Sequence, residues 1–271
     1  MMSGPTLLLL GCGKMGGALA KGWVDAKHPP RLIIIDRKLQ NAPGNSVIYR
    51  QVSDLPKDTR PDFVVLAIKP AASEAMLREL SQHLGSNLEN SALLSVMAGK
   101  NCATLAKASG RDDRAVIRTM PNTPASVGAG ATGIYFSPQV TQSQKQLATE
   151  LMEQVGDVVI VPHEDDLRSV IAVSGSSPAY VFLLAELLEK AGTELGLDQN
   201  ASRKLARSVI YGAGKMLHDL DDDASVLRNN VTSPNGTTAA ALKVLMTEEN
   251  WPQSVRKASQ EAVRRAKELD D

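Results

Sequence analysis

The stretch Thr6-Leu7-Leu8-Leu9-Leu10-Gly11-Cys12-Gly13-Lys14-Met15-Gly16 decides the fold of this chain. It begins with a short apolar run, typical of a buried parallel strand, and passes directly into the spacing GxGxxG at the start of a helical pattern. In that setting Gly11 permits a tight turn, Gly13 lets a pyrophosphate approach the backbone, and Gly16 lets the helix pack closely on the strand. The stretch therefore predicts a Rossmann-type dinucleotide site, which also includes the variable positions Cys12, Lys14 and Met15.

A second apolar run, Leu32–Ile35, ends at Asp36, close to the roughly 20-residue spacing at which this fold places an acidic residue on the cofactor ribose. A carboxylate there accepts a hydrogen bond from the 2′-hydroxyl of NADH and repels the extra phosphate of NADPH. Arg37 and Lys38 follow directly and have two interpretations, as solvated loop charges or as groups that neutralise that phosphate. Asp36 thus favours NADH, whereas Arg37 and Lys38 allow NADPH.

The overall composition is that of a globular enzyme without a nucleic-acid partner. The 271 residues carry 30 basic side chains (Lys and Arg) and 30 acidic ones, and aromatic residues make up 3% of the chain. A balanced charge offers no basic field for phosphate backbones, and few aromatic rings are available to stack on bases. We therefore expect a small-molecule substrate.

Targeting and metal-binding signals are equally sparse. No uninterrupted apolar run reaches the roughly 18 residues of a membrane span, and Leu7–Leu10 is too short for a signal-peptide core. We expect a cytoplasmic protein with no membrane partner. The only cysteines are Cys12 and Cys102, which in this placement indicate neither a disulfide framework nor a zinc site, so we predict no metal.

The hydrophobic pattern changes near Pro162. Before this point short Val, Ile and Leu runs alternate with helical stretches, which predicts a doubly wound parallel sheet of the α/β class. The further strands expected there are Phe63–Ile68, Ala92–Val96, Ala115–Arg118, Gly133–Phe136 and Val158–Val161. After His163 the pattern predicts only helices, at Leu167–Val173, Ala179–Leu195, Ala201–Leu220, Thr238–Met246 and Val255–Leu269. We therefore predict a Rossmann-type domain at residues 1–162 and an all-α helical domain at residues 163–271.

Ligands of open parallel sheets bind beyond the carboxyl ends of the strands, so the residues near these ends are candidates for the cofactor site. Those residues are Ala67, Lys69, Pro70, Ala98, Gly99 and Asn122. Pro70 fixes the backbone beside the cofactor, and the amide of Asn122 can bond a carboxamide such as that of nicotinamide. Lys69 has an equal alternative as an ordinary surface charge.

The helical half has an unusually apolar surface. The run Val181–Ala185 is apolar on every side, which indicates a helix that is either deeply buried or shared with another subunit. A second apolar stripe follows in Ala201–Leu220, where burial in the core is nearly as good an explanation. This half is therefore the expected place for dimerisation.

Near the far end of the chain, Val231-Thr232-Ser233-Pro234-Asn235-Gly236-Thr237-Thr238 precedes a strong helix-forming run. The segment combines four hydroxyl side chains, a Pro-Asn-Gly turn and a helix start whose free backbone N–H groups attract an anion. We interpret it as a pocket for a small carboxylate. The alternative is that Ser233 and Thr237 or Thr238 only cap the helix.

Five motifs in this order, GCGKMG, AIKP, RTMPNTP, SGSSPAY and LRNNVTSPNGTT, resemble the pyrroline-5-carboxylate reductase family across most of the chain. The last two motifs are the specific ones, and each departs from the family pattern at one position. Ser177 stands where glycine is common, so its hydroxymethyl group could alter substrate preference. Asn235 also replaces a glycine, but asparagine tolerates a left-handed backbone and should preserve the turn.

The resemblance implies reduction of 1-pyrroline-5-carboxylate to L-proline, with NADH or NADPH donating a hydride from nicotinamide C4 to the imine carbon. We expect Ser233 and the backbone N–H groups of Gly236, Thr237 and Thr238 to hold the substrate carboxylate, and the resemblance points to the same loop. The Thr238 hydroxyl is then expected to bond the ring nitrogen as the catalytic contact. In this family the helical domain of one subunit closes the site of its partner, so we expect a homodimer, with a larger ring such as a decamer left open.

Two other functions stay open. The chain could reduce another small cyclic imine or a 2-hydroxyacid. Hydroxyacid reductases generally carry a catalytic lysine in the helical domain, and Lys204 and Lys215 are available there without a recognisable motif. The chain could also be a non-catalytic dinucleotide-sensing protein, although the nearly intact Val231–Thr238 segment argues against this.

Overall fold

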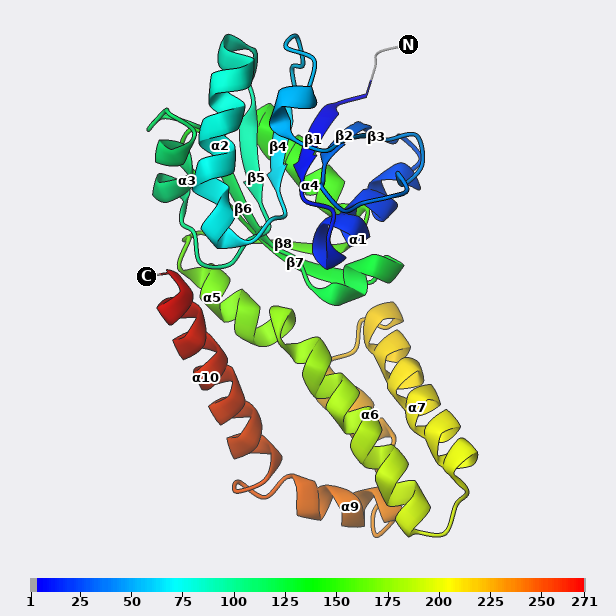
Figure 1. Cartoon of the computed structure of the whole chain (residues 1–271). Coiled ribbons are helices and arrows are strands. Elements are labelled where there is room, and N and C mark those ends of the chain that lie inside the picture. Colours follow the sequence, from blue (N-terminus) through cyan, green and yellow to red (C-terminus); the bar gives the residue numbers. More distant parts are fainter. Residues whose placement is uncertain (1–3, 271) are drawn as a thin grey trace. The chain divides into compact units, whose positions relative to one another are not determined.

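The computed structural model describes residues 4–270 of the chain. Internal contacts divide the chain into two compact units (Figure 1). The sheet unit comprises Met1–Gly175 and Ala262–Asp271, and the helical unit is Ser176–Glu261. The chain passes between the units twice, after Gly175 and within the last helix, α10 (Trp251–Asp270).

The sheet unit is built on eight strands in the spatial order β3-β2-β1-β4-β5-β6-β7-β8. The strands are β1 (Thr6–Leu10), β2 (Arg31–Ile35), β3 (Val47–Tyr49), β4 (Phe63–Leu66), β5 (Ala92–Ser95), β6 (Val116–Met120), β7 (Gly130–Phe136) and β8 (Gly156–Ile160). The chain moves outward from β1 to β2 and β3, and then returns to place β4 on the other side of β1. This doubly wound order confirms the predicted α/β class, and it places the glycine turn at the point where the strand order reverses.

One strand pair differs from the predicted parallel sheet. β6 and β7 are antiparallel, whereas the other neighbouring pairs are parallel. The short connection between these two strands holds only a 3-10 helix, η3 (Thr123–Val127), and a parallel crossover needs about a dozen residues or more. β7 therefore returns beside β6 in the reverse direction, and β8 follows the direction of β7.

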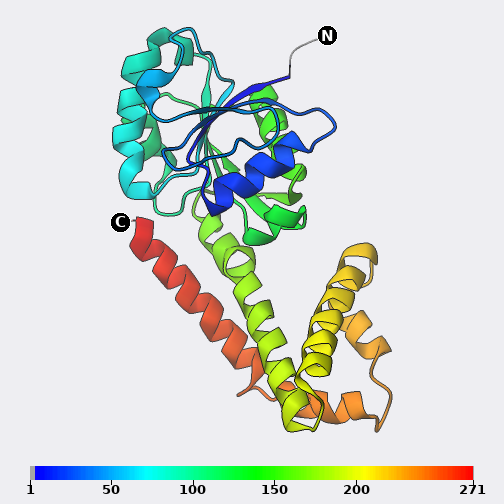
Figure 2. The same cartoon turned by 45° about the vertical axis from the view of Figure 1, so that its right-hand side comes forward.

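Two apolar layers cover the faces of the sheet, because successive side chains of a strand point to opposite faces. Leu7 and Leu9 of β1 pack in one cluster with Trp23, whose indole N–H donates to the carbonyl oxygen of Leu151 at 2.8 Å. Leu8 and Leu10 of the same strand pack in the cluster on the other face. Figure 2 shows the helices of these layers, which are α1 (Lys14–Val24), α2 (Pro70–Leu84), α3 (Cys102–Ala108) and α4 (Gln142–Glu153).

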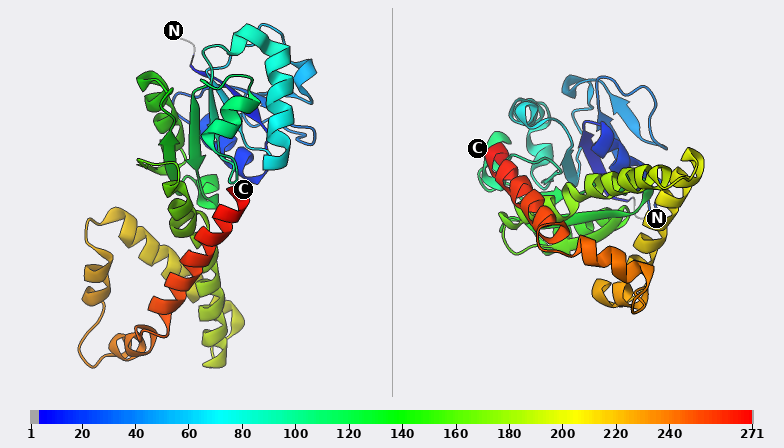
Figure 3. Two further views of the ribbon diagram at one scale, coloured as in Figure 1. Left: turned by 90° about the vertical axis from the view of Figure 1, so that its left-hand side faces the viewer. Right: turned by 90° about the horizontal axis from the view of Figure 1, so that it is seen from below.

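The helical unit contains no strand among its described residues, as the sequence predicts. Its helices are α6 (Ser177–Glu194), α7 (Gln199–Asp219), α8 (Ala224–Asn230), α9 (Thr237–Leu245) and the first part of α10. α6 and α7 lie side by side (Figure 3). Neither α8 nor the edge strand β3 is predictable from the sequence, because segments of seven and three residues are too short to show a periodic apolar pattern.

Most of the apolar surface of the helical unit is exposed within the single chain. α6 buries none of its residues, and Phe182 and Leu183 are 59% and 52% exposed. α7 buries only Ser202 and Ala206. Burial within this chain is therefore the wrong explanation for the apolar run Val181–Ala185, and a surface shared with another subunit is the explanation that remains of the two.

By length and composition, the helical run Asp166–Glu194 could also cross a membrane. The mean hydropathy of its most apolar 18-residue window is 1.5, and 6% of that window is buried. A single helix of this kind is a weak indication, and an interface between subunits requires the same exposed apolar surface. The absence of a membrane partner stays a prediction.

The predicted domain boundary at residue 162 lies directly after β8, which ends at Ile160. Residues 163–175 pack with the sheet unit, because α5 (Asp166–Val170) contacts β6 and β7. A π-helical turn, Ile171–Gly175, completes this segment. The contacts change from one unit to the other at Gly175, and the boundary at residue 162 stays a prediction.

Candidate active site

The glycine turn between β1 and α1 has the backbone geometry that its sequence predicts. Gly11 has a φ of +87°, which favours glycine, and a Cβ atom on Gly16 would lie 2.2 Å from the carbonyl oxygen of Gly11. Only glycine at position 16 lets the helix approach this closely. At Gly13, by contrast, an added Cβ would meet no heavy atom within 4 Å, so the backbone there is open to a ligand.

Helix α1 presents its amino end without a side-chain cap. Gly13 is the N-cap residue, and no side chain bonds the first N–H groups of the helix. These groups carry the positive end of the helix dipole and attract phosphate. Open space over Gly13 and an uncapped helix end together fit the pyrophosphate of a dinucleotide.

Asp36 follows β2 and is held by three backbone N–H groups. Its Oδ2 accepts from Cys12 at 2.8 Å, and its Oδ1 accepts from Lys38 at 2.8 Å and Leu39 at 2.9 Å. Burial alone would raise the pKa of this carboxyl, but these donors and the charge of Arg50 outweigh burial and lower the pKa below its usual range. Asp36 is therefore ionised near neutral pH and ties the end of β2 to the glycine turn, a role that the sequence did not reveal.

A cavity of about 530 Å³ lies at this turn. It brings together the predicted residues Gly11, Gly13, Asp36, Arg37, Lys38, Ala67 and Lys69. It also adds Arg50, which sequence analysis missed because β3, the strand before it, was not predicted. The Arg50 guanidinium donates to the carbonyl oxygens of Asp36 and Leu39, so it lies over the loop that follows β2.

The remaining predicted cofactor residues lie outside the lining of this cavity. Lys14 and Met15 form the first turn of α1, and Pro70 begins α2. Ala98 and Gly99 follow β5, where Gly99 is buried with a φ of +79°. The structure brings these residues to the carboxyl-end side of the sheet, as the strand order requires.

Asn122 has partners within the protein on both sides of its amide. Its Nδ2 donates to the carbonyl oxygen of Ser174 at 3.1 Å, and its Oδ1 accepts from the N–H of Ala131 at 2.9 Å. The side chain therefore fastens the loop after β6 to the π-helical turn. One N–H and one lone pair of the amide remain for a ligand, and the predicted bond to nicotinamide stays a prediction.

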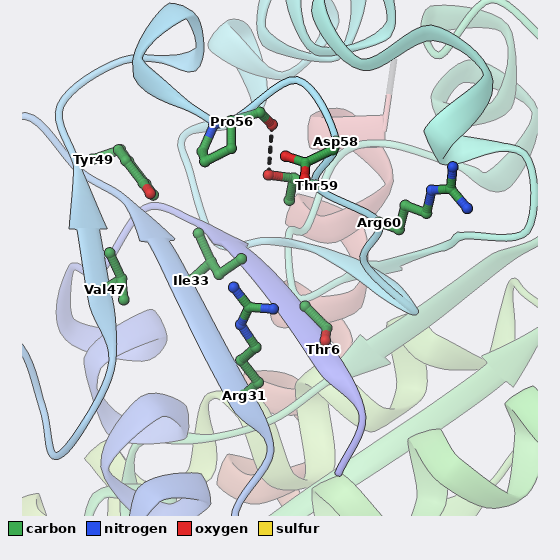
Figure 4. Close-up of a pocket in the computed structure, with 9 residues that line it drawn as sticks. All are labelled: Thr6, Arg31, Ile33, Val47, Tyr49, Pro56, Asp58, Thr59 and Arg60. Atoms are coloured by element: carbon green, nitrogen blue, oxygen red, sulfur yellow. Dashed lines mark hydrogen bonds between the residues drawn. The ribbon is translucent and has the colours of Figure 1, made fainter. Parts of the chain in front are cut away.

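A second cavity, of about 380 Å³, lies at the opposite ends of the strands (Figure 4). Its lining includes Thr6, Arg31 and Val47, which are the first residues of β1, β2 and β3. Cofactors of open parallel sheets bind at the carboxyl ends of the strands, and this cavity lies at the amino ends. The cavity at the glycine turn is therefore the candidate site.

In the helical unit, the predicted substrate segment forms a turn that leads into α9. Asn235 has a φ of 59°, which confirms the left-handed backbone expected at this position, and the N–H of Gly236 donates to the carbonyl oxygen of Ser233 at 3.0 Å. Gly236 is the N-cap of α9, and no side chain caps this helix. The alternative in which Ser233, Thr237 or Thr238 only caps the helix is therefore wrong.

The uncapped end of α9 has the polarity that a carboxylate requires. Thr238 is half-buried in the first turn, whereas Ser233 and Thr237 are exposed. Backbone N–H groups and hydroxyl groups thus meet at one helix end. The two halves of the predicted site lie in separate units, the glycine turn in the sheet unit and the predicted carboxylate-binding turn in the helical unit.

These features define a class of protein, a nicotinamide-dinucleotide-dependent oxidoreductase with a separate helical domain. Residues 6–99 match the family described as "NADP oxidoreductase coenzyme F420-dependent". Residues 164–269 match the family described as "Pyrroline-5-carboxylate reductase dimerisation". The second match covers the helical unit and the segment that leads into it.

Individual relatives agree along the whole length. The chain is 34% identical to the pyrroline-5-carboxylate reductase of Vibrio alginolyticus over 97% of both chains, and 34% identical to that of Pseudomonas aeruginosa over 99% of both. Among solved structures, a pyrroline-5-carboxylate reductase from Coxiella burnetii matches 98% of this chain and 99% of its own, with a TM-score of 0.89 and 32% identity. The pyrroline carboxylate reductase of Plasmodium falciparum, solved with NADP bound, matches 100% of both chains with a TM-score of 0.85 and 26% identity. The chain belongs to the pyrroline-5-carboxylate reductase family.

The glycine turn gives a matched pair of tests. We expect Gly16→Ala to lower the free energy of unfolding by about 1–3 kcal/mol, because its Cβ would collide with the Gly11 carbonyl. We expect Gly13→Ala to leave that free energy nearly unchanged and to weaken dinucleotide binding, because it fills the open space above the turn. Urea denaturation and a fluorescence titration with NADPH measure both effects. Equal stability of the two variants would contradict this account of the turn.

Proposed function

We propose that this protein reduces the cyclic imine 1-pyrroline-5-carboxylate to L-proline with a nicotinamide dinucleotide. The observation that carries the proposal is the uncapped amino end of α9, beside the turn that Asn235 and Gly236 form. The free N–H groups at such an end suit a small carboxylate. Membership of the family supports the same substrate, and the glycine turn of the sheet unit supports the cofactor.

The proposed reaction requires the protein to position its substrate. A protonated cyclic imine is already an electrophile, and the dinucleotide supplies the hydride when it is bound. The N–H groups of Thr237 and Thr238, with the Ser233 hydroxyl, hold the carboxylate. The Thr238 hydroxyl accepts a hydrogen bond from the protonated ring nitrogen. Contacts at two points of one flat ring restrict its movement and hold the imine carbon in a defined place for reduction.

The two thiols and Lys215 are poorly suited to a competing chemistry. Burial raises the pKa of the Cys12 thiol, and the charge of Asp36 raises it further. Burial also raises the pKa of Cys102, so both thiols stay protonated near neutral pH. A hydrogen bond to Asp219 raises the pKa of Lys215, which argues against this lysine as the base of a 2-hydroxyacid reductase.

Within this function we propose NADPH as the preferred cofactor, although the Asp36 carboxylate alone favours NADH. Three backbone N–H groups occupy that carboxylate, so its role in holding the glycine turn accounts for its presence. Arg37, Lys38 and Arg50 line the same cavity, and their charges suit a 2′-phosphate. We infer that the basic side chains decide the preference.

The reaction is tested by incubating the purified protein with NADPH or NADH and a five- or six-membered cyclic imine carboxylate, and following loss of the reduced cofactor. We expect turnover of the five-membered ring, and Thr238→Val should lower kcat/KM roughly 10- to 100-fold because a hydrogen bond to a charged group is lost. Thr238→Ser keeps the hydroxyl and should recover most of the rate. Thr247→Val, at the other end of α9, serves as the control. Equal kcat/KM for Thr238→Val and the natural protein would eliminate the proposed contact.

The cofactor preference has its own test. We expect Arg50→Ala to raise the KM for NADPH roughly tenfold and to leave the KM for NADH nearly unchanged, because only NADPH carries the 2′-phosphate. Arg60→Ala is the control, since Arg60 bonds Asn87 near the amino ends of the strands. A rise of the same size for both cofactors would show that Arg50 acts through the loop backbone and would contradict its role in selection.

We further propose that the protein works in the cytosol as a homodimer, with a larger ring such as a decamer as the other assembly to be distinguished. The exposed apolar residues of α6 support an interface between subunits. We expect Phe182→Asp to reduce the mass seen by light scattering towards the 28.9 kDa of one chain and to abolish turnover. Lys190→Glu, an exposed change on the same helix, is the control. A natural protein that is monomeric and fully active would contradict the shared interface.

A further inference from the structure

The loop between β5 and α3 is clamped by the far end of the chain. This loop, residues 96–101, contains Ala98 and Gly99, which sequence analysis places beside the cofactor. A Cβ on Gly99 would lie 2.5 Å from the carbonyl oxygen of Leu269, in the last turn of α10. The C-terminal turn of the helix therefore packs directly on the loop backbone, and both belong to the sheet unit.

An ion pair holds this last turn in place. The Nε of Arg168, in α5, donates to Oδ2 of Asp270 at 2.7 Å, and the two side chains are 25% and 14% exposed. Arg168 also pairs with Asp165 at 2.8 Å, but the Asp165 side chain is 78% exposed. Pairing in a partly buried place is stronger than pairing at the surface, so Asp270 is the partner through which Arg168 anchors α10.

The end of the loop at α3 is anchored by Glu164, which lies just before α5 in the same segment as Arg168. Oε1 of Glu164 accepts from the N–H of Cys102, the first residue of α3, at 2.7 Å and from Arg118 of β6 at 3.0 Å. Arg118 is almost fully buried, so this pair is rigidly placed. Residues 164 and 168 therefore fix both sides of the loop that sequence analysis assigns to the cofactor.

The anchored loop also has a backbone N–H group without a protein partner among the described residues. The N–H of Ala98, a partly exposed residue, has no partner among the described residues, whereas the N–H of Val96 donates to the carbonyl oxygen of Leu66. Unpaired N–H groups in a rigid loop can serve a ligand, and their value depends on how firmly they are held.

We propose that Arg168 and Asp270 are positioning residues for the cofactor, because their ion pair holds the last turn of α10 against Gly99 and so fixes the loop of residues 96–101, which the sequence predicts to lie beside the dinucleotide. The inference rests on the proposed function only in assigning a dinucleotide to this loop. Since α10 begins in the helical unit and ends at this loop, the pair also makes cofactor binding sensitive to the ordering of the C-terminal helix.

The test uses the full-length protein and needs no substrate. We expect Asp270→Ala and Arg168→Ala each to raise the dissociation constant for NADPH about three- to tenfold, measured at a temperature where both variants are fully folded. The double variant should be no worse than Arg168→Ala alone, because the ion pair with Asp270 is already lost when Arg168 is replaced. Hydrogen exchange of the peptide spanning residues 97–105 should quicken in parallel. Asp165→Ala, which removes only the exposed partner of Arg168, should bind NADPH like the natural protein.

Two results would overturn the proposal: unchanged NADPH binding in both single variants, or a double variant whose loss equals the sum of the two single losses. The second result would mean that the residues act independently and not as a pair. A natural protein that binds NADPH but reduces no cyclic imine would contradict the proposed function alone, and the same titrations would still decide the role of the pair.

Discussion

The approach of Gly16 to the carbonyl oxygen of Gly11 is the constraint on which the cofactor half depends. It lets α1 begin close to the end of β1. The uncapped N–H groups of the helix therefore lie next to Gly13, whose backbone is open to a ligand. Asp36 completes the turn by accepting the N–H of Cys12, and its ionised state keeps that bond strong. A phosphate site thus arises from backbone geometry, with few side chains committed to it.

In the helical half, α9 also begins with a glycine N-cap and no side-chain cap, and its proposed ligand is a carboxylate. A left-handed Asn235 and an N-cap Gly236 leave the first turn of α9 without side-chain caps among the described residues, and Ser233, Thr237 and Thr238 lie in this turn or directly before it. The helices of this unit keep an exposed apolar surface that a single chain does not cover. The first fact fits the proposed reduction of a small anionic ring, and the second fits a helical domain whose family is described by its dimerisation.

The sequence predicts well whatever depends on local backbone requirements. Glycine spacing, the apolar runs of β1 and β2, and the left-handed Asn235 each follow from one short segment. It fails where distant segments decide the result. The reversal of β7, the N–H groups that occupy Asp36, and the bonds of Asn122 to Ser174 and Ala131 all depend on partners that no local pattern specifies. The place of Arg50 in the cavity is not predictable for a related reason, since β3, the strand directly before it, is too short to show a pattern.

The central claim is that backbone N–H groups at the start of α9 hold the carboxylate of the substrate ring. The most direct measurement is an NMR titration of ¹⁵N-labelled protein, saturated with oxidised cofactor, with an unreactive five-membered ring carboxylate such as tetrahydrofuran-2-carboxylate. The account predicts that the amide signals of Thr237 and Thr238 move downfield together as the ligand binds. Binding of the ligand with these two signals unmoved, and others shifted, would contradict it.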